Sequence, residues 1–437
     1  MRIKIICPTL FDPNNQLIKL RRASSPPLSI LYLAGLTPPE HDVSVVDEVV
    51  QSIDFEEPVD LVAITSATVA VRRAYQIADE FQRRNVKVVM GGIHVTSLPN
   101  EALAHVDAVV LGEGDEIWPK VLEDAQQGAL RRIYQGTRKE SLENLPFPRF
   151  DLVDKSRYVR LPFRKTPICP VQTARGCPHS CDFCSVSVFW GRKMRFRPVE
   201  DIVAEIRYSQ ADTIFFTDDN FMAHPRRTRE LVEALTPLNI RYICQFDTLA
   251  HREPELIGAI ARSGCFLAFV GFESIKTKVL AEANKSFNNP SQYPELIRLL
   301  HKNGINVYAS FLFGFEHDDF DTARATADFL IDQKVSLASF FRLAPYAGTR
   351  LYDRLTQDGI LVDKTWWLEP GELYSRMRFP GKPHTTEELS SLAMGRFFSL
   401  PSILKRFFPL PLFKIPFLGR NLYIHKQLKR FKGAPIV

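Results

Sequence analysis

A chain of 437 residues, 45% of them hydrophobic and 24% charged, has the length of about three domains and the composition of a folded protein, which excludes intrinsic disorder. The net charge of +6 comes from one end: nine Lys or Arg and no Asp or Glu follow Glu388, so the rest of the chain is net negative. A charge confined in this way excludes a general nucleic-acid-binding surface.

The first residues, MRIKIICPTLFDP, contain a short apolar run that ends at Asp12 and Pro13. This run predicts a buried strand and not a signal peptide. No stretch of the sequence reaches the roughly 18 uninterrupted apolar residues of a membrane-spanning helix. The seven cysteines are an odd number, which argues against a framework of disulfides. We therefore expect a cytoplasmic protein.

Residues 1–130 alternate apolar runs with amphipathic segments. The runs are rich in Val and Ile and lie at 3–7, 43–47, 60–66, 86–92 and 107–113. The segment 70–84 has apolar residues at helical spacing. This alternation predicts a doubly wound, Rossmann-like parallel sheet. Residues 131–165 lack periodicity, and we expect them to form a linker to the next domain.

Small and polar residues follow three of these predicted strands, at the edge where parallel sheets bind their ligands. Residues of this kind let a flat or phosphate-bearing ligand approach the backbone closely. For each glycine taken alone, a tight turn without a ligand is the alternative. The candidates are Thr65, Ser66, Gly91, Gly92, His94, Gly112 and Glu113.

Strand–helix alternation returns, with longer helices, in residues 166–345. We expect strands at 168–174, 212–218, 241–247, 266–272, 306–314 and 337–343. We expect helices at 198–210, 224–237, 253–264, 291–304 and 319–333. Six units are too few for a closed eight-unit barrel. The pattern therefore predicts a partial, open (β/α)6 barrel whose site lies at the carboxyl ends of its strands.

The segment RGCPHSCDFC places Cys177, Cys181 and Cys184 on one loop directly after the first strand of this barrel. Three thiolates on a short loop can hold three corners of a cube-shaped iron–sulfur cluster, which leaves the fourth iron open for a substrate or cofactor. A zinc site would need a fourth ligand, for which His179 is available within the loop. A disulfide with one spare thiol is a further alternative, which a reducing compartment disfavours.

The Cys-x3-Cys-x2-Cys spacing, with the aromatic Phe183 before the last cysteine, resembles the signature of radical S-adenosylmethionine (SAM) enzymes, and the resemblance extends over residues 166–345. It implies a [4Fe-4S] cluster whose open iron binds SAM and whose electron releases a 5′-deoxyadenosyl radical. An external electron donor such as a flavodoxin or ferredoxin is then expected.

The same resemblance assigns SAM to residues at the strand ends. Carboxylate and carbonyl groups suit the buried ammonium of the methionine moiety, and a glycine allows the adenine to lie against the backbone. For Asp219, a solvated loop or a helix cap is the alternative. The expected SAM residues are Phe183, Asp218, Asp219, Asn220, Gln245, Glu273 and Gly314.

The order of the two domains is similar to that of cobalamin-binding radical SAM proteins, and the segments 26–38, 91–96 and 112–124 resemble parts of their first domain. The resemblance implies that the strand-end residues of the first domain bind cobalamin. The Asp-x-His-x-x-Gly loop of many cobalamin proteins is absent, since His94 is followed by Val-Thr-Ser. Some relatives keep this domain without the cofactor, which is the alternative.

The resemblance implies C-methylation of an unactivated carbon on an apolar metabolite such as an isoprenoid lipid or a tetrapyrrole. One alternative is a radical cyclase, oxidase or carbon–carbon coupling enzyme that transfers no methyl group. An alternative of another class is a non-catalytic iron–sulfur scaffold or sensor. Cleavage of SAM distinguishes that last alternative from the others.

Residues 346–437 form a C-terminal extension. The aromatic segment 365–379 is expected to line the substrate side of the barrel. The segment 396–431 combines Phe, Leu and Ile with Lys and Arg, and its prolines predict short helical pieces. Such pieces suit peripheral contact with an anionic membrane surface. A lid that packs its Phe residues on the barrel is an equal alternative.

Overall fold

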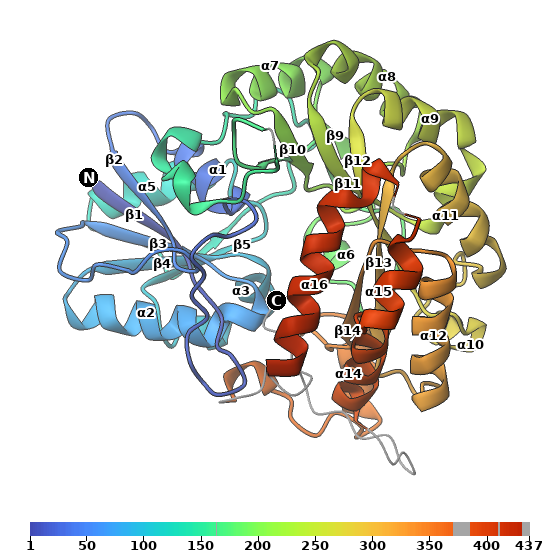
Figure 1. The fold of residues 1–437 in the computed structure, drawn as a ribbon. Coiled ribbons are helices and arrows are strands. Elements are labelled where there is room, and N and C mark those ends of the chain that lie inside the picture. The colour runs from blue at the N-terminus through green and yellow to red at the C-terminus, as the bar shows by residue number, and fades with distance from the viewer. Residues whose placement is uncertain (163, 370–384, 410, 431–437) are drawn as a thin grey trace.

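The computed structural model describes residues 1–162, 164–369, 385–409 and 411–430. Two α/β domains lie side by side, each built on a parallel sheet, and a helical extension follows the second (Figure 1). The predicted fold class is confirmed: a Rossmann-like sheet precedes a partial barrel of six strands.

The N-terminal sheet has the strand order β2-β1-β3-β4-β5-β6, and all its strands are parallel. Its strands are β1 Arg2–Cys7, β2 Asp42–Asp47, β3 Leu61–Thr65, β4 Lys87–Gly91, β5 Ala108–Leu111 and β6 Ile133–Gln135. Because Val88, Val89 and Met90 are buried on both faces, these strands read as continuous apolar runs in the sequence. Strand β6 lies beyond the predicted boundary at residue 130 and extends the sheet into the expected linker.

Helices cover both faces of this sheet (Figure 1). Residues of α1 and α5 pack with Ile3 and Ile5 on one face, while residues of α2 pack with Ile6 and Val62 on the other. The helices are α1 Leu28–Leu36, α2 Val71–Arg83, α3 Ile93–Ser97, α4 Pro99–Ala102 and α5 Trp118–Gln126.

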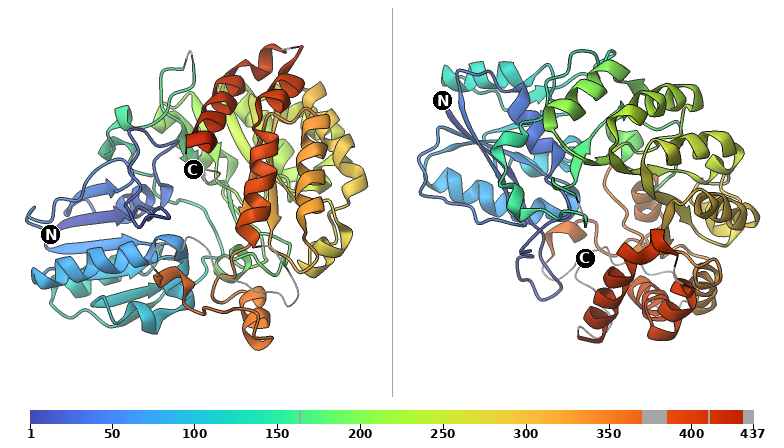
Figure 2. Two further views of the ribbon diagram at one scale, coloured as in Figure 1. Left: turned by 60° about the horizontal axis from the view of Figure 1, so that its bottom comes forward. Right: turned by 45° about the horizontal axis from the view of Figure 1, so that its top comes forward.

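The barrel sheet has the order β14-β13-β12-β11-β10-β7, again with all strands parallel. Its strands are β7 Cys169–Val171, β10 Thr213–Phe216, β11 Arg241–Phe246, β12 Cys265–Glu273, β13 Asn306–Phe313 and β14 Leu337–Arg342. An arc of helices surrounds it (Figure 2). They are α7 Val199–Ser209, α8 Pro225–Leu235, α9 Pro254–Arg262, α10 Thr277–Glu282, α11 Tyr293–Lys302 and α12 Phe320–Asp332. Each of the six predicted strands is present.

A short antiparallel hairpin, β8 Ala174–Arg175 and β9 Arg195–Phe196, stands apart from the barrel sheet. The loop between its strands contains the three clustered cysteines and the helix α6 Val186–Phe189. The sequence pattern had placed residue 174 in the first barrel strand, so this hairpin was not predicted.

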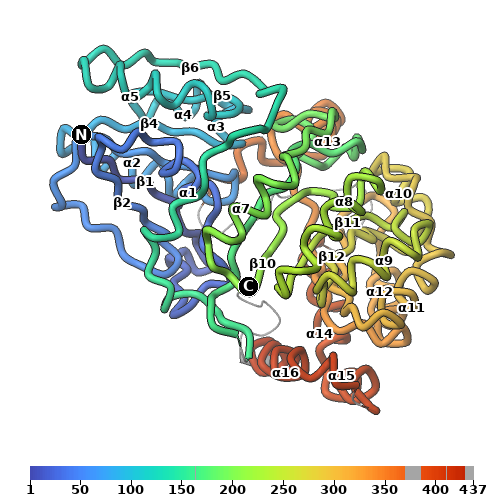
Figure 3. Tube along the Cα trace, turned by 90° about the horizontal axis from the view of Figure 1, so that it is seen from above, coloured from blue at the N-terminus to red at the C-terminus, as the bar shows by residue number. Residues whose placement is uncertain are grey.

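The C-terminal extension contains α13 Arg350–Gln357, α14 Thr386–Phe397, α15 Leu400–Phe407 and α16 Ile415–Arg430. Helix α14 packs on α12 and β14, and α15 and α16 lie beside it (Figure 3). The side chains of Ile403, Phe407 and Phe417 pack against Phe266 and Leu267 at the start of β12. The extension therefore packs Phe residues on the barrel, as the lid alternative predicts.

Helix α16 is longer than the short pieces that the prolines predict, because Pro416 lies in its first turn, where a missing N–H costs nothing. The aromatic segment also differs from expectation. Trp366 and Trp367 are buried against the N-terminal domain, and the Trp367 Nε1–H donates to Glu101. Phe315 and Leu343, which follow barrel strands, belong to the same apolar cluster. Residues 370–379 of that segment lie outside the described residues.

In the described ranges, every helix is too short or too polar to cross a lipid bilayer.

Candidate active site

The cysteine loop leaves β8 through Gly176, which has a φ of +98°; a Cβ there would lie 2.6 Å from the carbonyl oxygen of Lys193. Glycine is therefore required at this turn. The three thiols are half-buried, and burial raises the pKa of Cys177 to about 11 and that of Cys181 to about 12. Coordination to a metal would be needed to hold them as thiolates. No three His, Cys, Asp or Glu side chains of the described residues are gathered as a metal ion requires.

His179 is engaged elsewhere and does not complete a zinc site. Its Nε2 lies 2.5 Å from Oδ2 of Asp247, and its ring stacks on Phe287 with 3.8 Å between centroids. Burial alone would raise the pKa of Asp247, but its hydrogen bond and charge interaction with His179 keep that pKa below the usual value. This geometry disfavours the zinc alternative.

The two adjacent aspartates after β10 have different environments. The Asp218 carboxylate accepts from the backbone N–H groups of Thr173 and Ala174 at 2.8 and 2.5 Å, and from the Thr173 hydroxyl at 3.0 Å. Among the described residues, the Asp219 carboxylate has only its own backbone N–H as a hydrogen-bond partner. Burial, followed by the charge of Asp218, raises the pKa of Asp219 to about 7. Of the two predicted SAM residues, Asp219 is the one left available to a ligand.

The charge of Asp219 acts on the thiols of Cys177 and Cys184, which places it beside the cysteine loop. Asn220 donates from Nδ2 to Asp247 at 2.8 Å. Gln245 donates to the backbone carbonyl of Asp219 at 3.2 Å. The ends of β10 and β11 thus meet beside the cysteines.

Glu273 lies at a register shift at the end of β12, with a φ of +65°. Its Oε1 pairs with Nζ of Lys285 at 2.7 Å, and both residues act electrostatically on Cys181. Phe183 packs edge-on against Phe315, with 6.3 Å between centroids. The neighbouring Gly314 has a φ of +123° and donates from its N–H to Asp318. Four strand ends therefore contribute residues around the cysteine loop.

Lys285 and Asp247 were not singled out from the sequence. Lys285 is 7% exposed and lies in a loop after α10, where no motif marks it. Asp247 ends a predicted strand, and its position beside the other strand-end acids could have identified it. Both bring charge close to the cysteines.

A cavity of about 530 Å³ lies between the two domains. This volume is in the roughly 300–1,000 Å³ range of cofactor sites. The N-terminal domain lines it with six of its seven predicted residues, which are Thr65, Ser66, Gly91, Gly92, Gly112 and Glu113. The barrel lines it with Gln172, Arg175, Phe189, Trp190, Arg197 and Thr217. The residues that fit a flat cofactor thus face the domain that carries the cysteines.

A close backbone approach at Gly92 shapes this cavity. Gly92 has a φ of +110°, and a Cβ there would lie 2.7 Å from the carbonyl oxygen of Ser66. The ends of β3 and β4 can therefore approach each other only with glycine at this position. The result is the cradle of small residues that a flat macrocycle needs.

Two predicted cobalamin residues behave differently from expectation. His94 is buried outside the cavity, where Nε2 lies 2.9 Å from Oε1 of Glu101 and Nδ1 lies 3.3 Å from the Thr68 hydroxyl. Because α3 turns its ring into the core, His94 does not reach the cavity. Glu113 lines the cavity, but its carboxylate pairs with Arg175 and Arg195 at 2.7 Å each.

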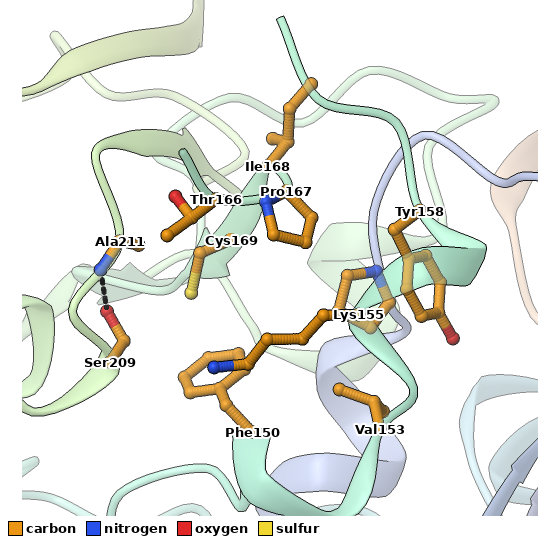
Figure 4. A pocket seen from close by; sticks show the side chains of 11 residues that line it. Phe150, Val153, Lys155, Tyr158, Thr166, Pro167, Ile168, Cys169, Ser209 and Ala211 are labelled. Carbon is orange, nitrogen blue, oxygen red and sulfur yellow. Dashed lines mark hydrogen bonds between the residues drawn. The ribbon is translucent and has the colours of Figure 1, made fainter. Parts of the chain in front are cut away.

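A second, smaller pocket of about 30 Å³ lies at the opposite end of β7 (Figure 4). Thr166, Cys169, Lys155 and Tyr158 are among its lining residues. Its volume admits about one or two water molecules. It lies at the amino end of the strand, whereas the cysteine loop follows the carboxyl end, so it is not part of the site.

Residues 171–330 match the model of the Radical SAM superfamily, so the barrel is a radical SAM domain. The chain is a radical SAM enzyme with an additional domain, since residues 23–122 match the B12 binding domain. These two domains identify its cofactors as a [4Fe-4S] cluster, SAM and cobalamin.

Curated relatives align over about three quarters of the chain. The chain is 29% identical to bacteriochlorophyllide d C-12(1)-methyltransferase of Chlorobaculum tepidum, over 76% of this chain and 74% of the relative. It is 29% identical to the C-8(2)-methyltransferase of that organism, over 78% of each. It is 23% identical to the hopanoid C-2 methylase of Rhodopseudomonas palustris, over 78% of this chain and 66% of the relative.

A solved structure has the same fold. TsrM from Kitasatospora setae, a radical SAM methyltransferase solved with cobalamin and a [4Fe-4S] cluster, aligns with a TM-score of 0.69. The alignment covers 99% of this chain and 100% of TsrM at 14% identity.

Proposed function

We propose that this enzyme methylates an unactivated carbon of an apolar metabolite, either a tetrapyrrole or an isoprenoid lipid. The observation that carries the proposal is the shared cavity: the strand ends of the B12-binding domain form one wall, and the loop that bears the three cysteines contributes Phe189 and Trp190 to the other. The named relatives act on bacteriochlorophyllides and a hopanoid.

In this proposal Cys177, Cys181 and Cys184 hold the cluster, and Asp219 accepts the ammonium group of SAM. Glu273, held by Lys285, is placed to accept from the ribose hydroxyls or the ammonium. The small residues Gly91, Gly92 and Ser66 allow the corrin to approach the sheet edge. When bound, the cluster supplies the electron for SAM cleavage, and cobalamin supplies the methyl group.

The inner face of the barrel sheet supports an apolar substrate. Side chains alternate along each strand, and Ile214, Phe216 and Val270 are buried on the helix side. The opposite face carries Phe269 and Tyr308, whose rings lie 5.0 Å apart, and Phe341, which is 40% exposed. Aromatic residues on this face suit an apolar substrate.

The experiment uses anaerobically reconstituted protein with cobalamin, SAM, dithionite and either bacteriochlorophyllide d or a hopanoid. We expect 5′-deoxyadenosine, S-adenosylhomocysteine and a methylated product by mass spectrometry. 5′-Deoxyadenosine with a modified but unmethylated product would instead indicate cyclisation, oxidation or coupling. If the protein does not cleave SAM under any of these conditions, the remaining alternative is a non-catalytic iron–sulfur scaffold or sensor.

The Asp219→Asn enzyme should bind SAM about tenfold or more weakly, because a hydrogen bond to a charged group contributes about 1.5–3 kcal/mol. Equilibrium dialysis of the cluster-loaded protein measures this. Glu316→Gln is the control, since this acid is exposed just after the end of β13. Equal SAM affinity in wild type and Asp219→Asn would exclude the assigned role.

Radical SAM chemistry requires a reductant, and a flavodoxin or ferredoxin is the donor proposed here. Replacing dithionite by a reduced flavodoxin in the same assay tests it.

Contact with the inner face of the membrane is proposed for the extension. Exposed apolar residues form a tail stripe, which comprises Leu400, Leu404, Phe408, Leu412, Ile415, Leu422 and Tyr423. Leu400 and Leu404 are spaced four residues apart, so they share one side of α15, and Phe408 follows directly after this helix.

The Leu404→Asp/Phe408→Asp protein should bind vesicles of anionic phospholipid at least about tenfold more weakly than wild type, because each inserted side chain contributes about 1.5–3 kcal/mol. Vesicle sedimentation measures this. Tyr208→Asp is the control, since Tyr208 is 51% exposed on α7, outside the stripe. If the wild-type protein does not sediment with vesicles at low salt, membrane contact is excluded and the lid alternative stands.

A further inference from the structure

Two arginines close the base of the cysteine loop. Arg175 on β8 and Arg195 on β9 are directly paired across the hairpin, and their side chains are only 2% and 4% exposed. Arg175 precedes Cys177 by two residues, and the loop returns at Arg195. Two buried guanidinium groups at opposite positions of a hairpin repel each other unless an anion compensates them.

The anion is Glu113, which comes from the other domain. Its Oε2 lies 2.7 Å from Nη1 of Arg175, its Oε1 lies 2.7 Å from Nη2 of Arg195, and its side chain is fully buried. Glu113 lies on the loop that follows β5 of the B12-binding domain. One carboxylate therefore joins both ends of the cysteine loop.

The surrounding contacts hold this carboxylate in place. Asp115 accepts from Arg175 at 2.8 and 3.0 Å, and it also accepts from the Tyr32 hydroxyl at 2.5 Å. Two acids thus balance two arginines in a buried network. A Cβ at Gly136 would lie 2.0 Å from the backbone carbonyl oxygen of Glu113. The backbone after β6 is therefore in close contact with the backbone of Glu113.

We propose that Glu113 is a positioning residue for the iron–sulfur site: through Arg175 and Arg195 it fixes the loop that holds the cluster, so the B12-binding domain completes the cluster site of the barrel. The inference rests on the proposed function in one respect, that the loop binds a cluster. It assigns Glu113 to the cluster loop, whereas the sequence suggested that Glu113 contacts cobalamin.

The test uses full-length Glu113→Gln, reconstituted anaerobically with iron and sulfide. Residues that orient metal ligands typically contribute ten- to a hundredfold in metal affinity, so iron should be lost to a chelator about tenfold faster than from wild type. The electron paramagnetic resonance spectrum of the reduced, SAM-bound cluster should also change. Glu113→Asp keeps the charge and should recover part of both effects.

Glu48→Gln is the matched control. Glu48 is equally buried and pairs with Arg73 at 2.6 Å, but both residues belong to the N-terminal domain. This variant should keep the iron retention and the spectrum of wild type, although it also loses a buried ion pair. If Glu48→Gln loses iron as fast as Glu113→Gln, general destabilisation explains the result and the proposal is overturned.

Two further outcomes are decisive. Wild-type iron retention and spectrum in Glu113→Gln would overturn the proposal, and a loss confined to cobalamin affinity would return Glu113 to the role that the sequence suggested. If Glu113→Gln does not fold, the electron paramagnetic resonance spectrum of Glu113→Asp tests the proposal instead. That spectrum should differ from the wild-type spectrum, because the shorter side chain cannot reach both arginines in the same way, and an unchanged spectrum would overturn the proposal. Failure of wild type itself to bind a cluster would instead contradict the proposed function.

Discussion

Protein with Cys177, Cys181 or Cys184 changed to Ala should emerge from anaerobic reconstitution without a stable cluster, and it should form no 5′-deoxyadenosine. Each substitution removes one of only three thiolates that the loop supplies, and no other cysteine lies on this loop. Because the thiols are otherwise protonated at neutral pH, two remaining cysteines have little tendency to retain iron. Iron and sulfide analysis, together with the visible absorbance of the cluster, measures the loss.

Cys265→Ala serves as the control for this series. Cys265 is buried at the start of β12, where its sulfur lies 3.7 Å from that of Cys244. Its loss removes buried packing contacts but should leave the iron content unchanged, since a small buried thiol acts there as an apolar side chain. Retention of a full cluster by a protein lacking all three loop cysteines would disprove the assignment.

The second large effect is expected at the shared cavity. Ala67 lines the cavity and is exposed at the edge of the sheet, so Ala67→Trp can add volume without disturbing the core. Displacing the added indole side chain to admit the cofactor costs about 1–3 kcal/mol of binding free energy, so cobalamin affinity should fall about ten- to a hundredfold. The absorbance of cobalamin retained after gel filtration measures binding directly.

Ala104→Trp is the matched control, because Ala104 is exposed in the same domain but does not line the cavity. It should bind cobalamin as the wild type does. Iron content should be unchanged in both variants, since the cysteines lie on a separate loop. Full cobalamin binding by Ala67→Trp would mean that the cofactor lies elsewhere.

The two parallel sheets could be predicted because strands buried on both faces leave continuous apolar runs, such as 86–92 and 266–272. The three cysteines were recognisable because their spacing within one loop is independent of long-range packing. The short strands β6, β8 and β9 were missed or merged, since two or three residues carry no periodicity. Tertiary contacts alone define them.

The finer assignments depended on the direction of single side chains. Asp218 and Asp219 are adjacent, and only the structure shows that the first is occupied by Thr173 and Ala174. His94 lies two residues after the cavity-lining Gly92, yet α3 turns its ring into the core. Glu113 lies at the predicted ligand-binding edge of the N-terminal sheet, but its partners are arginines more than sixty residues later in the chain. Sequence spacing within one domain cannot report such contacts.

The buried cations of the extension change how the protein should behave on an ion exchanger. Arg406 and Lys414 are 1% and 3% exposed, and burial lowers their pKa values to about 9 and about 8. Arg396 and Lys405 face Asp328 and Asp332 of α12. The isoelectric point of about 8.8 calculated from the sequence therefore overstates the basicity that this end presents to a resin. Native protein should elute from a cation exchanger at lower salt than its denatured chain.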